Sequence, residues 1–282
     1  MIHWPGSAGG RLSNASQVFE HGGVRLIDEV LGVIDGFQGV NDDGRPGAGD
    51  GAAAVNRPRH LVFLHGWGLN RESLRGIAIL FQHTYRIHLI DLPGFGEAPP
   101  PPPDWDTTKY ADLVERYIST FLPASVIVVG HSFGGRVALR LAARRQAYLA
   151  GVALLAVPGL PLQGWSRRRW RRLGIRGLRQ LLRTLQPLLG HGPLEWHTRT
   201  YGSRDYLNAG PLREVFVRTV NEDLTDSARQ SSCPFLLVYG TDDTETPPWL
   251  GFAYRALMPD RATLDLLPHK DHHLYSGTGA HL

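Results

Sequence analysis

The stretch Val126-Ile127-Val128-Val129-Gly130-His131-Ser132-Phe133-Gly134 decides the fold class of this 282-residue chain. It opens with four β-branched residues, as a short buried strand does, and the Ala-, Leu- and Arg-rich stretch 137–145 beyond it is typical of a helix. The G-x-S-x-G spacing lies between them. In a strand–turn–helix setting this spacing holds the serine in a strained turn and exposes its hydroxyl above the sheet. The alternative is a glycine-rich turn with an idle serine.

Further apolar runs of the same form lie along the chain, and helical patterns separate them. The runs are Leu61–Leu64, Tyr85–Ile90, Val152–Val157, Phe235–Tyr239 and Ala262–Leu267. Strands that alternate with helices predict an α/β fold, in which helices cover both faces of a mostly parallel sheet. Upstream, the runs Gln17–Glu20 and Val24–Leu31 flank a Gly-Gly turn and predict a β-hairpin.

This alternation divides the chain into a core and an insertion. We expect residues 17–158 and 227–282 to form the core, and residues 159–226, which have helical periodicity, to form an inserted helical cap. We interpret residues 1–16 as a loose N-terminal segment. Residues 35–58 are rich in Gly, Asp, Asn and Ala, which predicts a long surface loop.

The composition is that of a globular protein, with 42% hydrophobic and 20% charged residues. No run of about 18 apolar residues is present, so no transmembrane segment is expected. The N-terminus lacks the basic start and the apolar stretch of a secretory leader. Cys233 is the single cysteine, which excludes an internal disulfide and fits a reducing compartment. We therefore expect a cytoplasmic location.

The segments that follow the apolar runs resemble those of a known family. They are His65-Gly66-Trp67-Gly68, Asp91-Leu92-Pro93-Gly94-Phe95-Gly96, the Ser132 turn, Tyr239-Gly240-Thr241-Asp242-Asp243 and the late His272. In this order they resemble the α/β-hydrolase family, over about residues 17–275. The first two look most like those of carboxylesterases of the pimeloyl-ACP methyl ester esterase type. The resemblance implies an α/β-hydrolase fold and hydrolysis of a carboxylic ester, with a short or medium acyl group, through an acyl-enzyme.

The family order is serine, then acid, then histidine, which places the acid after Ser132. The acid usually ends a strand in a Gly-x-x-Asp pattern, and here that pattern joins Gly240 to Asp243. Asp242 is the main alternative and Glu245 a third candidate. Either aspartate could also serve only to order the turn.

Three histidines follow the last apolar run, namely His269, His272 and His273. The family spacing of strand, short loop and histidine points to His272, with His273 as the alternative. A zinc site is disfavoured because neither H-E-x-x-H nor paired cysteines occur elsewhere. We expect no metal and no cofactor, because a Ser-His-Asp triad with an oxyanion hole completes the chemistry.

The resemblance also implies which groups would stabilise the oxyanion. They are the backbone N–H of Phe133, which follows the nucleophile, and that of Trp67, which follows His-Gly. Trp67 and His131 are expected to line the substrate pocket. His65 is expected to be structural, and Asp91 to order its own turn.

One stretch of the chain is strongly basic. No Asp or Glu occurs between Glu115 and Glu195, and this stretch holds 13 arginines. Arg176, Arg179 and Arg183 fall on one helical face, which is either a solvated surface or an anion-steering surface at the mouth of the site. The candidate anions are an acidic acyl carrier protein, a coenzyme A thioester or a membrane surface. Nucleic acid is not an expected partner, because no nucleic-acid-binding motif is present.

Other functions are open on the same scaffold. Thioester hydrolysis, C–C bond hydrolysis or a lyase reaction could use the same residues. A non-catalytic protein could bind a ligand in the same pocket. Dehalogenases and epoxide hydrolases are disfavoured, because their nucleophile is an aspartate where this chain has Ser132.

Overall fold

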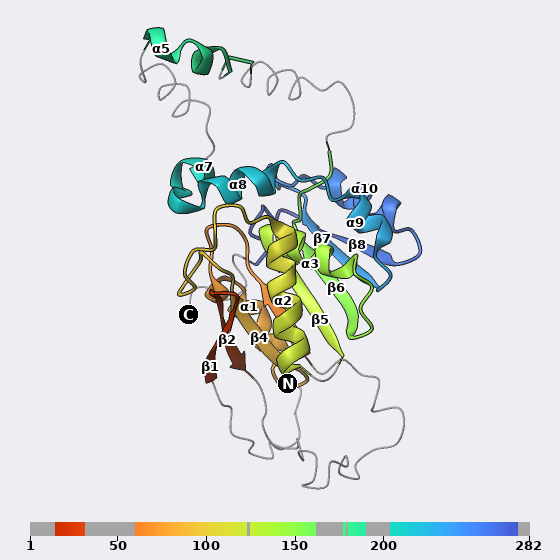
Figure 1. Ribbon diagram of the computed structural model, residues 1–282. Coiled ribbons are helices and arrows are strands. Elements are labelled where there is room, and N and C mark those ends of the chain that lie inside the picture. Colours follow the sequence, from red (N-terminus) through yellow and green to blue (C-terminus); the bar gives the residue numbers. More distant parts are fainter. Residues whose placement is uncertain are drawn as a thin grey trace, which may run out of the picture.

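Eight strands form one sheet at the centre of the molecule (Figure 1). The computed structural model describes residues 15–31, 60–122, 125–161, 177–178, 180–189 and 204–275. The strands are β1 (Ala15–His21), β2 (Val24–Leu31), β3 (His60–Leu64), β4 (Arg86–Asp91), β5 (Val126–His131), β6 (Leu149–Leu155), β7 (Phe235–Gly240) and β8 (Ala262–Leu267). They lie in the order β1-β2-β4-β3-β5-β6-β7-β8. The surface loop expected at 35–58 lies outside the described residues, as do residues 1–14 of the expected loose N-terminal segment.

The sheet is parallel except at one edge. Strands β3 to β8 run parallel, whereas β2 pairs antiparallel with both β1 and β4. The turn from β1 to β2 contains Gly22 and Gly23, whose φ angles are +60° and +77°. Two consecutive residues with positive φ make the tight turn that suits the twist of a hairpin. The predicted hairpin and the predicted mostly parallel sheet are confirmed.

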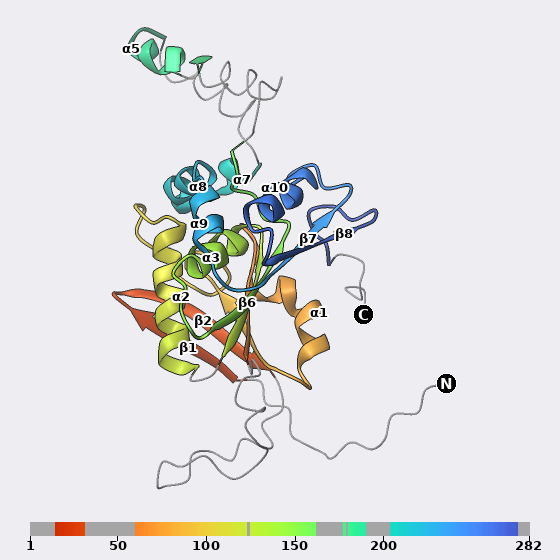
Figure 2. The same ribbon diagram turned by 90° about the vertical axis from the view of Figure 1, so that its right-hand side faces the viewer.

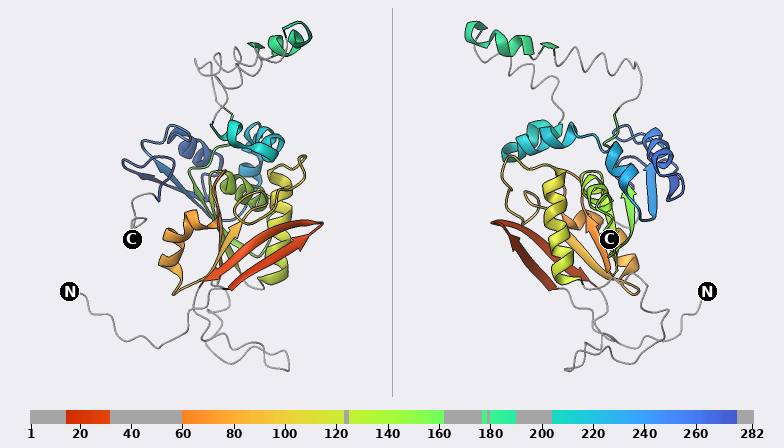
Figure 3. Two further views of the ribbon diagram at one scale, coloured as in Figure 1. Left: turned by 90° about the vertical axis from the view of Figure 1, so that its left-hand side faces the viewer. Right: turned by 45° about the vertical axis from the view of Figure 1, so that its right-hand side comes forward.

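Helices cover both faces of the sheet (Figure 2, Figure 3). One face carries α2 (Thr107–Phe121), α3 (Phe133–Ala142), α9 (Thr225–Gln230) and α10 (Trp249–Leu257), and the other carries α1 (Arg75–Ala78) between the 3-10 turns Arg71–Leu74 and Ile79–Phe81. Val62 and Leu64 of β3 pack toward α2 and α3. Leu61 and Phe63 of the same strand pack toward α1. Both faces are therefore apolar, which is why the strand reads as an uninterrupted apolar run.

The chain between β6 and β7 contributes helices above the carboxyl ends of the parallel strands (Figure 1). These are α7 (Arg204–Asn208), the 3-10 turn Gly210–Leu212 and α8 (Arg213–Val220), while α9 packs against α3. Residues 177–178 and 180–184 are also helical, and α5 (Gln186–Leu189) follows them. Leu178 and Leu181 of this stretch are exposed. In open parallel sheets the carboxyl edge, which α7 and α8 overlie, is where sites form.

One strand differs from its expected bounds. The run Val152–Val157 predicts β6, but the strand spans Leu149–Leu155. Ala156 leaves the strand with a φ of +50°, and both Ala156 and Val157 stay fully buried. The apolar pattern therefore continues past the point where the backbone turns. Among the described residues, we find no helix that is both long and apolar enough to cross a bilayer.

Candidate active site

Ser132 lies at the turn between β5 and α3, in a backbone conformation that side chains rarely adopt. Its φ is +47° and its ψ is −104°. Such a conformation costs about 1–3 kcal/mol, and it persists only where the surrounding structure enforces it. The Ser132 N–H donates to the carbonyl of Leu155 at 2.9 Å, and its own carbonyl accepts from the Arg136 N–H at 3.2 Å. The serine is thus fixed by strand β6 and by its own helix.

Close backbone contacts require the two flanking glycines. A Cβ on Gly130 would lie 2.6 Å from the Gly134 carbonyl oxygen, and one on Gly134 would lie 2.2 Å from the Leu64 carbonyl oxygen. Real Cβ atoms essentially never approach another atom so closely, so only glycine fits. The Gly134 N–H also donates to the His65 carbonyl at 3.0 Å. The G-x-S-x-G spacing therefore reflects the packing of this turn against the end of β3.

A continuous hydrogen-bonded chain joins Ser132, His272 and Asp243. His272 Nε2 lies 3.0 Å from Ser132 Oγ, and His272 Nδ1 lies 2.9 Å from Asp243 Oδ2. The three residues follow β5, β8 and β7, so the carboxyl ends of these strands bring them together. The serine hydroxyl can donate to Nε2 while Nδ1–H donates to the carboxylate. This arrangement is chemically able to remove the proton from the serine hydroxyl.

Asp243, and not its neighbour Asp242, contacts the histidine. Asp243 is buried, whereas Asp242 is exposed. Asp243 Oδ1 accepts the N–H groups of Glu245 (2.7 Å) and Thr246 (2.8 Å), so the same carboxylate orders the turn after β7. The Glu245 side chain is 67% exposed, and its Oε2 lies 3.9 Å from His272 Nε2. Asp243 thus both orders the turn after β7 and contacts the His272 ring.

Thr246 contacts both the acid and the histidine, and the sequence analysis did not identify it. Its buried hydroxyl donates to Asp243 Oδ2 and lies 3.0 Å from His272 Nδ1. The available signal was the Asp-x-x-Thr spacing, because an aspartate often accepts the backbone N–H of the residue three positions later. That spacing predicts the turn, but only the fold brings His272 to it.

The acid and the histidine shift each other's ionisation. Burial opposes ionisation of Asp243, but hydrogen bonds from His272 and Thr246 outweigh burial and lower the pKa of this carboxyl to about 2. Burial also disfavours the charged form of His272, yet the hydrogen bond to Asp243 and its charge prevail and raise the pKa of the imidazole above 6.5. The carboxylate is therefore charged at neutral pH, and His272 is a stronger base than a free histidine.

The two alternative histidines lie elsewhere on the same loop. His269 is exposed, with its Nδ1 3.8 Å from Asp242 Oδ2. The His273 N–H donates to Asp271 Oδ1 at 2.9 Å, and His273 lines a cavity at the site. The structure places His272 between the serine and the buried acid.

His131, the last residue of β5, is buried beneath this chain of residues. Its Nε2–H donates to the backbone carbonyl of His272 at 3.0 Å, and its Nδ1 lies 3.5 Å from the Tyr275 hydroxyl. Burial, and after it the charge of nearby His272, lower the pKa of His131 to about 3, so the ring is neutral. His131 lines the cavity at Ser132 and also contacts the loop that carries His272.

The backbone N–H groups of Trp67 and Phe133 have no hydrogen-bond acceptor within the ranges that the structure describes. Phe133 is the first residue of α3, where N–H groups lack partners inside the helix. Trp67 follows β3 and lines the cavity together with Ser132. Both groups are therefore free to donate to a ligand.

His65 fixes the loop that carries Trp67. Its Nδ1–H donates to the Gly66 carbonyl at 2.8 Å, and its Nε2 accepts the Leu92 N–H at 3.1 Å. Burial lowers the pKa of His65 to about 4, which keeps the ring neutral and allows Nε2 to accept. His65 thus connects the loop after β3 to the loop after β4.

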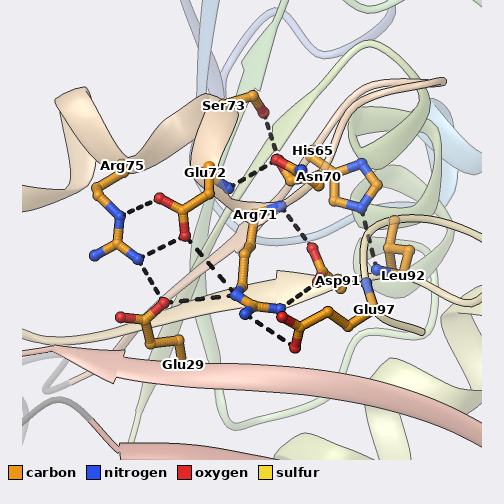
Figure 4. Close-up of polar contacts among 10 residues, drawn as sticks. All are labelled: Glu29, His65, Asn70, Arg71, Glu72, Ser73, Arg75, Asp91, Leu92 and Glu97. Atoms are coloured by element: carbon orange, nitrogen blue, oxygen red, sulfur yellow. Dashed lines mark hydrogen bonds and ion pairs between the residues drawn. The ribbon is translucent and has the colours of Figure 1, made fainter.

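Asp91 joins the same two loops through charge (Figure 4). Its carboxylate accepts the Arg71 N–H at 2.7 Å, pairs with the Arg71 guanidinium and accepts the Glu97 N–H at 3.1 Å. Arg71 also lies 3.5 Å from Glu29 of β2. Asp91 therefore orders its own turn and also anchors the segment that follows the Trp67 loop.

Ser132 and His272 border two cavities. The first has a volume of about 650 Å³ and is lined by the loops 66–70 and 94–96 and by Asn208 and Leu212. The second has a volume of about 680 Å³, and its lining includes Phe133, Arg136, Phe216 and Trp249. Trp67 borders both cavities, with its ring centroid 5.3 Å from that of Phe133 and 4.9 Å from that of Phe216. Aromatic rings therefore wall the space on one side of the serine.

The remaining predicted site residues are only partly described. Arg183 is exposed on the helical stretch 180–184, whereas Arg176 and Arg179 lie outside the described residues. Within the described ranges, no group of three or more His, Cys, Asp and Glu side chains is arranged to hold a metal ion.

Two known proteins with sequences similar to this chain are named as esterases. Residues 61–278 match the Alpha/beta hydrolase family. The pimeloyl-[acyl-carrier protein] methyl ester esterase of Photorhabdus laumondii is 41% identical over 98 residues, which is 35% of this chain and 36% of that protein. The enzyme of the same name from Hamiltonella defensa is 30% identical over 204 residues, which is 66% of this chain and 76% of that protein. The chain thus matches little more than a third of the first relative and about three quarters of the second.

A solved structure supports the same fold. The crystal structure of a membrane phospholipase A, described as a bacterial virulence factor, superposes with a TM-score of 0.64 at 18% identity, covering 93% of this chain and 81% of that chain. At this identity the likeness concerns the fold alone. The family match covers most of the chain and includes the Ser132 turn, the loop with Asp243 and the loop with His272. On its sheet order, its strand-end site and these matches, the chain belongs to the alpha/beta hydrolase family.

Proposed function

We propose that this protein hydrolyses carboxylic esters, with Ser132 as nucleophile, His272 as general base and Asp243 as the acid that orients the base. The observation that carries the proposal is the hydrogen-bonded chain from Ser132 Oγ through the His272 ring to the buried Asp243 carboxylate. The esterase names of the two curated relatives support the reaction type.

Each residue has a defined step in the proposed mechanism. His272 Nε2 takes the hydroxyl proton as Ser132 Oγ attacks the ester carbonyl, and the Asp243 carboxylate stabilises the imidazolium that forms. The proton then passes to the departing alcohol and leaves an acyl-enzyme, which water hydrolyses by the same route. The N–H groups of Trp67 and Phe133 donate to the oxyanion, and each such donor typically contributes about 3 kcal/mol.

The geometry of the site supports the type of reaction more directly than it supports a class of substrate. We propose short or medium acyl groups, and an acyl carrier protein or a coenzyme A thioester as the carrier, for which the arginine-rich stretch 167–183 supplies positive charge. The relatives' name, which includes an acyl-carrier-protein ester, supports this choice. Thioester hydrolysis, C–C hydrolysis and a lyase reaction are the alternatives on the same residues. A cytoplasmic location stays a prediction from the sequence.

Labelling with a fluorophosphonate tests whether the serine is active. The wild-type protein should be labelled at Ser132, and Ser132→Ala should not be labelled. A panel of p-nitrophenyl esters of rising chain length should then be hydrolysed by the wild type. His272→Ala should abolish turnover, whereas His273→Ala should retain most of it. An unlabelled wild-type protein that still binds esters would support a non-catalytic ligand-binding protein instead.

A further inference from the structure

Arg136 places a buried cation at the wall of the second cavity. Helix α3 carries it one turn after Ser132, whose carbonyl accepts the Arg136 N–H. The residue is only 6% exposed, and it lines the cavity of about 680 Å³ together with Ser132, Phe133 and His272. The serine turn and the helix that follows it therefore present a hydroxyl and a guanidinium to the same cavity.

Among the described residues, a single acceptor contacts this guanidinium. Nη1 donates to the Thr219 carbonyl at 2.8 Å. A guanidinium has five N–H donors, and no Asp or Glu in the described part of the chain lies within ion-pair distance of Arg136. Burial lowers the pKa of Arg136, which reflects the cost of holding its charge away from water. A buried charge without a counter-ion is unfavourable, so an anion that enters this cavity would gain a ready partner.

Two of the acids that line this cavity, Glu222 and Asp223, have other partners. Glu222 accepts the backbone N–H at the start of α2 at 2.9 Å and lies 3.6 Å from Arg140. Asp223 accepts the N–H and the hydroxyl of Thr225 at 2.9 Å and 2.6 Å. Neither carboxylate lies within ion-pair distance of the Arg136 guanidinium, although the charge of Glu222 still acts on it, and the Arg136 side chain lines the cavity.

We propose that Arg136 binds a carboxylate of the substrate, so that the preferred substrates are esters bearing a free carboxylate, such as half-esters of dicarboxylic acids. This inference rests on the proposed ester hydrolysis at Ser132. A carboxylate can accept two parallel hydrogen bonds from one guanidinium, which gives both affinity and orientation.

The exposed rim of the site favours a single negative charge. Asp205 and Glu245 line the cavity near the serine, and both are exposed. Their charge opposes a doubly charged group bound at Arg136 more strongly than a singly charged one. A monocarboxylate therefore fits the combination of a buried guanidinium and an acidic rim better than a phosphate does.

Paired substrates test the inference directly. We would measure kcat/KM for p-nitrophenyl half-esters of dicarboxylic acids of rising chain length, and for p-nitrophenyl alkanoates of matched length. A second pair carries the carboxylate on the alcohol side. The wild type should prefer the charged member of at least one pair. In Arg136→Gln the ratio of charged to neutral kcat/KM should fall roughly 10- to 100-fold, mainly through KM. Arg136→Lys should retain part of the preference.

Arg145→Gln is the charge control, because it removes one positive charge from an exposed residue just beyond α3 and should change the ratio by less than about twofold. A ratio that falls equally in both variants would overturn the inference, since the effect would then be diffuse charge. So would a wild type with no preference in either pair. The neutral ester also reports on folding of each variant.

If neutral esters are hydrolysed and turnover depends on Ser132, a missing preference overturns only the carboxylate subsite. If Ser132→Ala keeps its turnover, the proposed function itself fails.

Discussion

His131 holds the backbone of His272, because its Nε2–H donates to the His272 carbonyl at 3.0 Å. The two residues are 141 positions apart in the chain. His131 is itself fixed as the last residue of β5, directly before the serine. The neighbour of the proposed nucleophile thus positions the loop of the proposed base, and this connection does not pass through the serine side chain.

Replacing His131 should disturb the base without removing it. In His131→Phe the His272 carbonyl loses its donor, and a shift of the base by about 1 Å should lower kcat roughly 10- to 100-fold. His131→Gln keeps an N–H donor of similar reach and should recover much of that loss. Steady-state kinetics with a neutral ester and melting curves of both variants would check this. Equal loss in both variants, with equal loss of stability, would mean that His131 only fills space.

The strained conformation of Ser132 should be visible in stability. Ser132→Gly should be more stable than Ser132→Ala by about 1 kcal/mol, because glycine adopts a positive φ without strain. Both variants should lose ester hydrolysis by about a thousandfold or more. Urea denaturation gives the free energies of unfolding. A glycine variant no more stable than the alanine variant would show that the turn stores little strain.

The pH dependence of kcat/KM should follow the ionisation of His272. The base must be neutral, so activity falls as the pH drops through its pKa, which Asp243 raises above 6.5. Asp243→Asn removes that effect, so the acid limb should move to lower pH while the plateau falls by about a thousandfold or more. Asp242→Asn should leave the limb and the plateau near those of the wild type. An acid limb that stays in place in Asp243→Asn would contradict the assignment.

The arginine face proposed to steer anions should act at long range. Arg176, Arg179 and Arg183 replaced together by glutamine remove three charges and keep much of the apolar stems. For a substrate on an acidic carrier protein or coenzyme A, kcat/KM should fall, and the loss should shrink as salt rises. A neutral p-nitrophenyl ester should show no change. Equal effects on both substrates would point to packing, and no effect on either to a solvated surface.

The sequence predicts the central strands β3, β4 and β5 well because they are buried on both faces. Leu61–Leu64 and Phe235–Tyr239 read as short apolar runs closed by glycine-containing turns, and both lie in strands. The run Val152–Val157 predicts a strand that ends too late, because burial continues after the backbone has left the sheet. A run of apolar residues indicates which residues are buried. It predicts the ends of a strand only where the buried segment and the strand end at the same residue.

Some residues of the site can be predicted from the local sequence, whereas others depend on contacts between distant parts of the chain. Ser132 is identifiable because its turn imposes a local spacing of glycines. The Gly-x-x-Asp spacing favours Asp243 over Asp242, but only the packing of the turn shows that Asp243 is buried and Asp242 exposed. The contacts of Thr246 with His272 and the cavity position of Arg136 depend on strands and helices that meet only in the folded protein.

The contact between Gly134 and the end of β3 has a consequence for how the protein responds to heat. Because Gly134 donates to His65 across that contact, the serine turn and the Trp67 loop belong to one tightly joined unit. Such units open together with the sheet that carries them. The cavity wall formed by Leu212 and Phe216 comes instead from the chain between β6 and β7. On warming, the protein should therefore lose its discrimination between substrates first. It should continue to hydrolyse a small ester until the sheet itself unfolds.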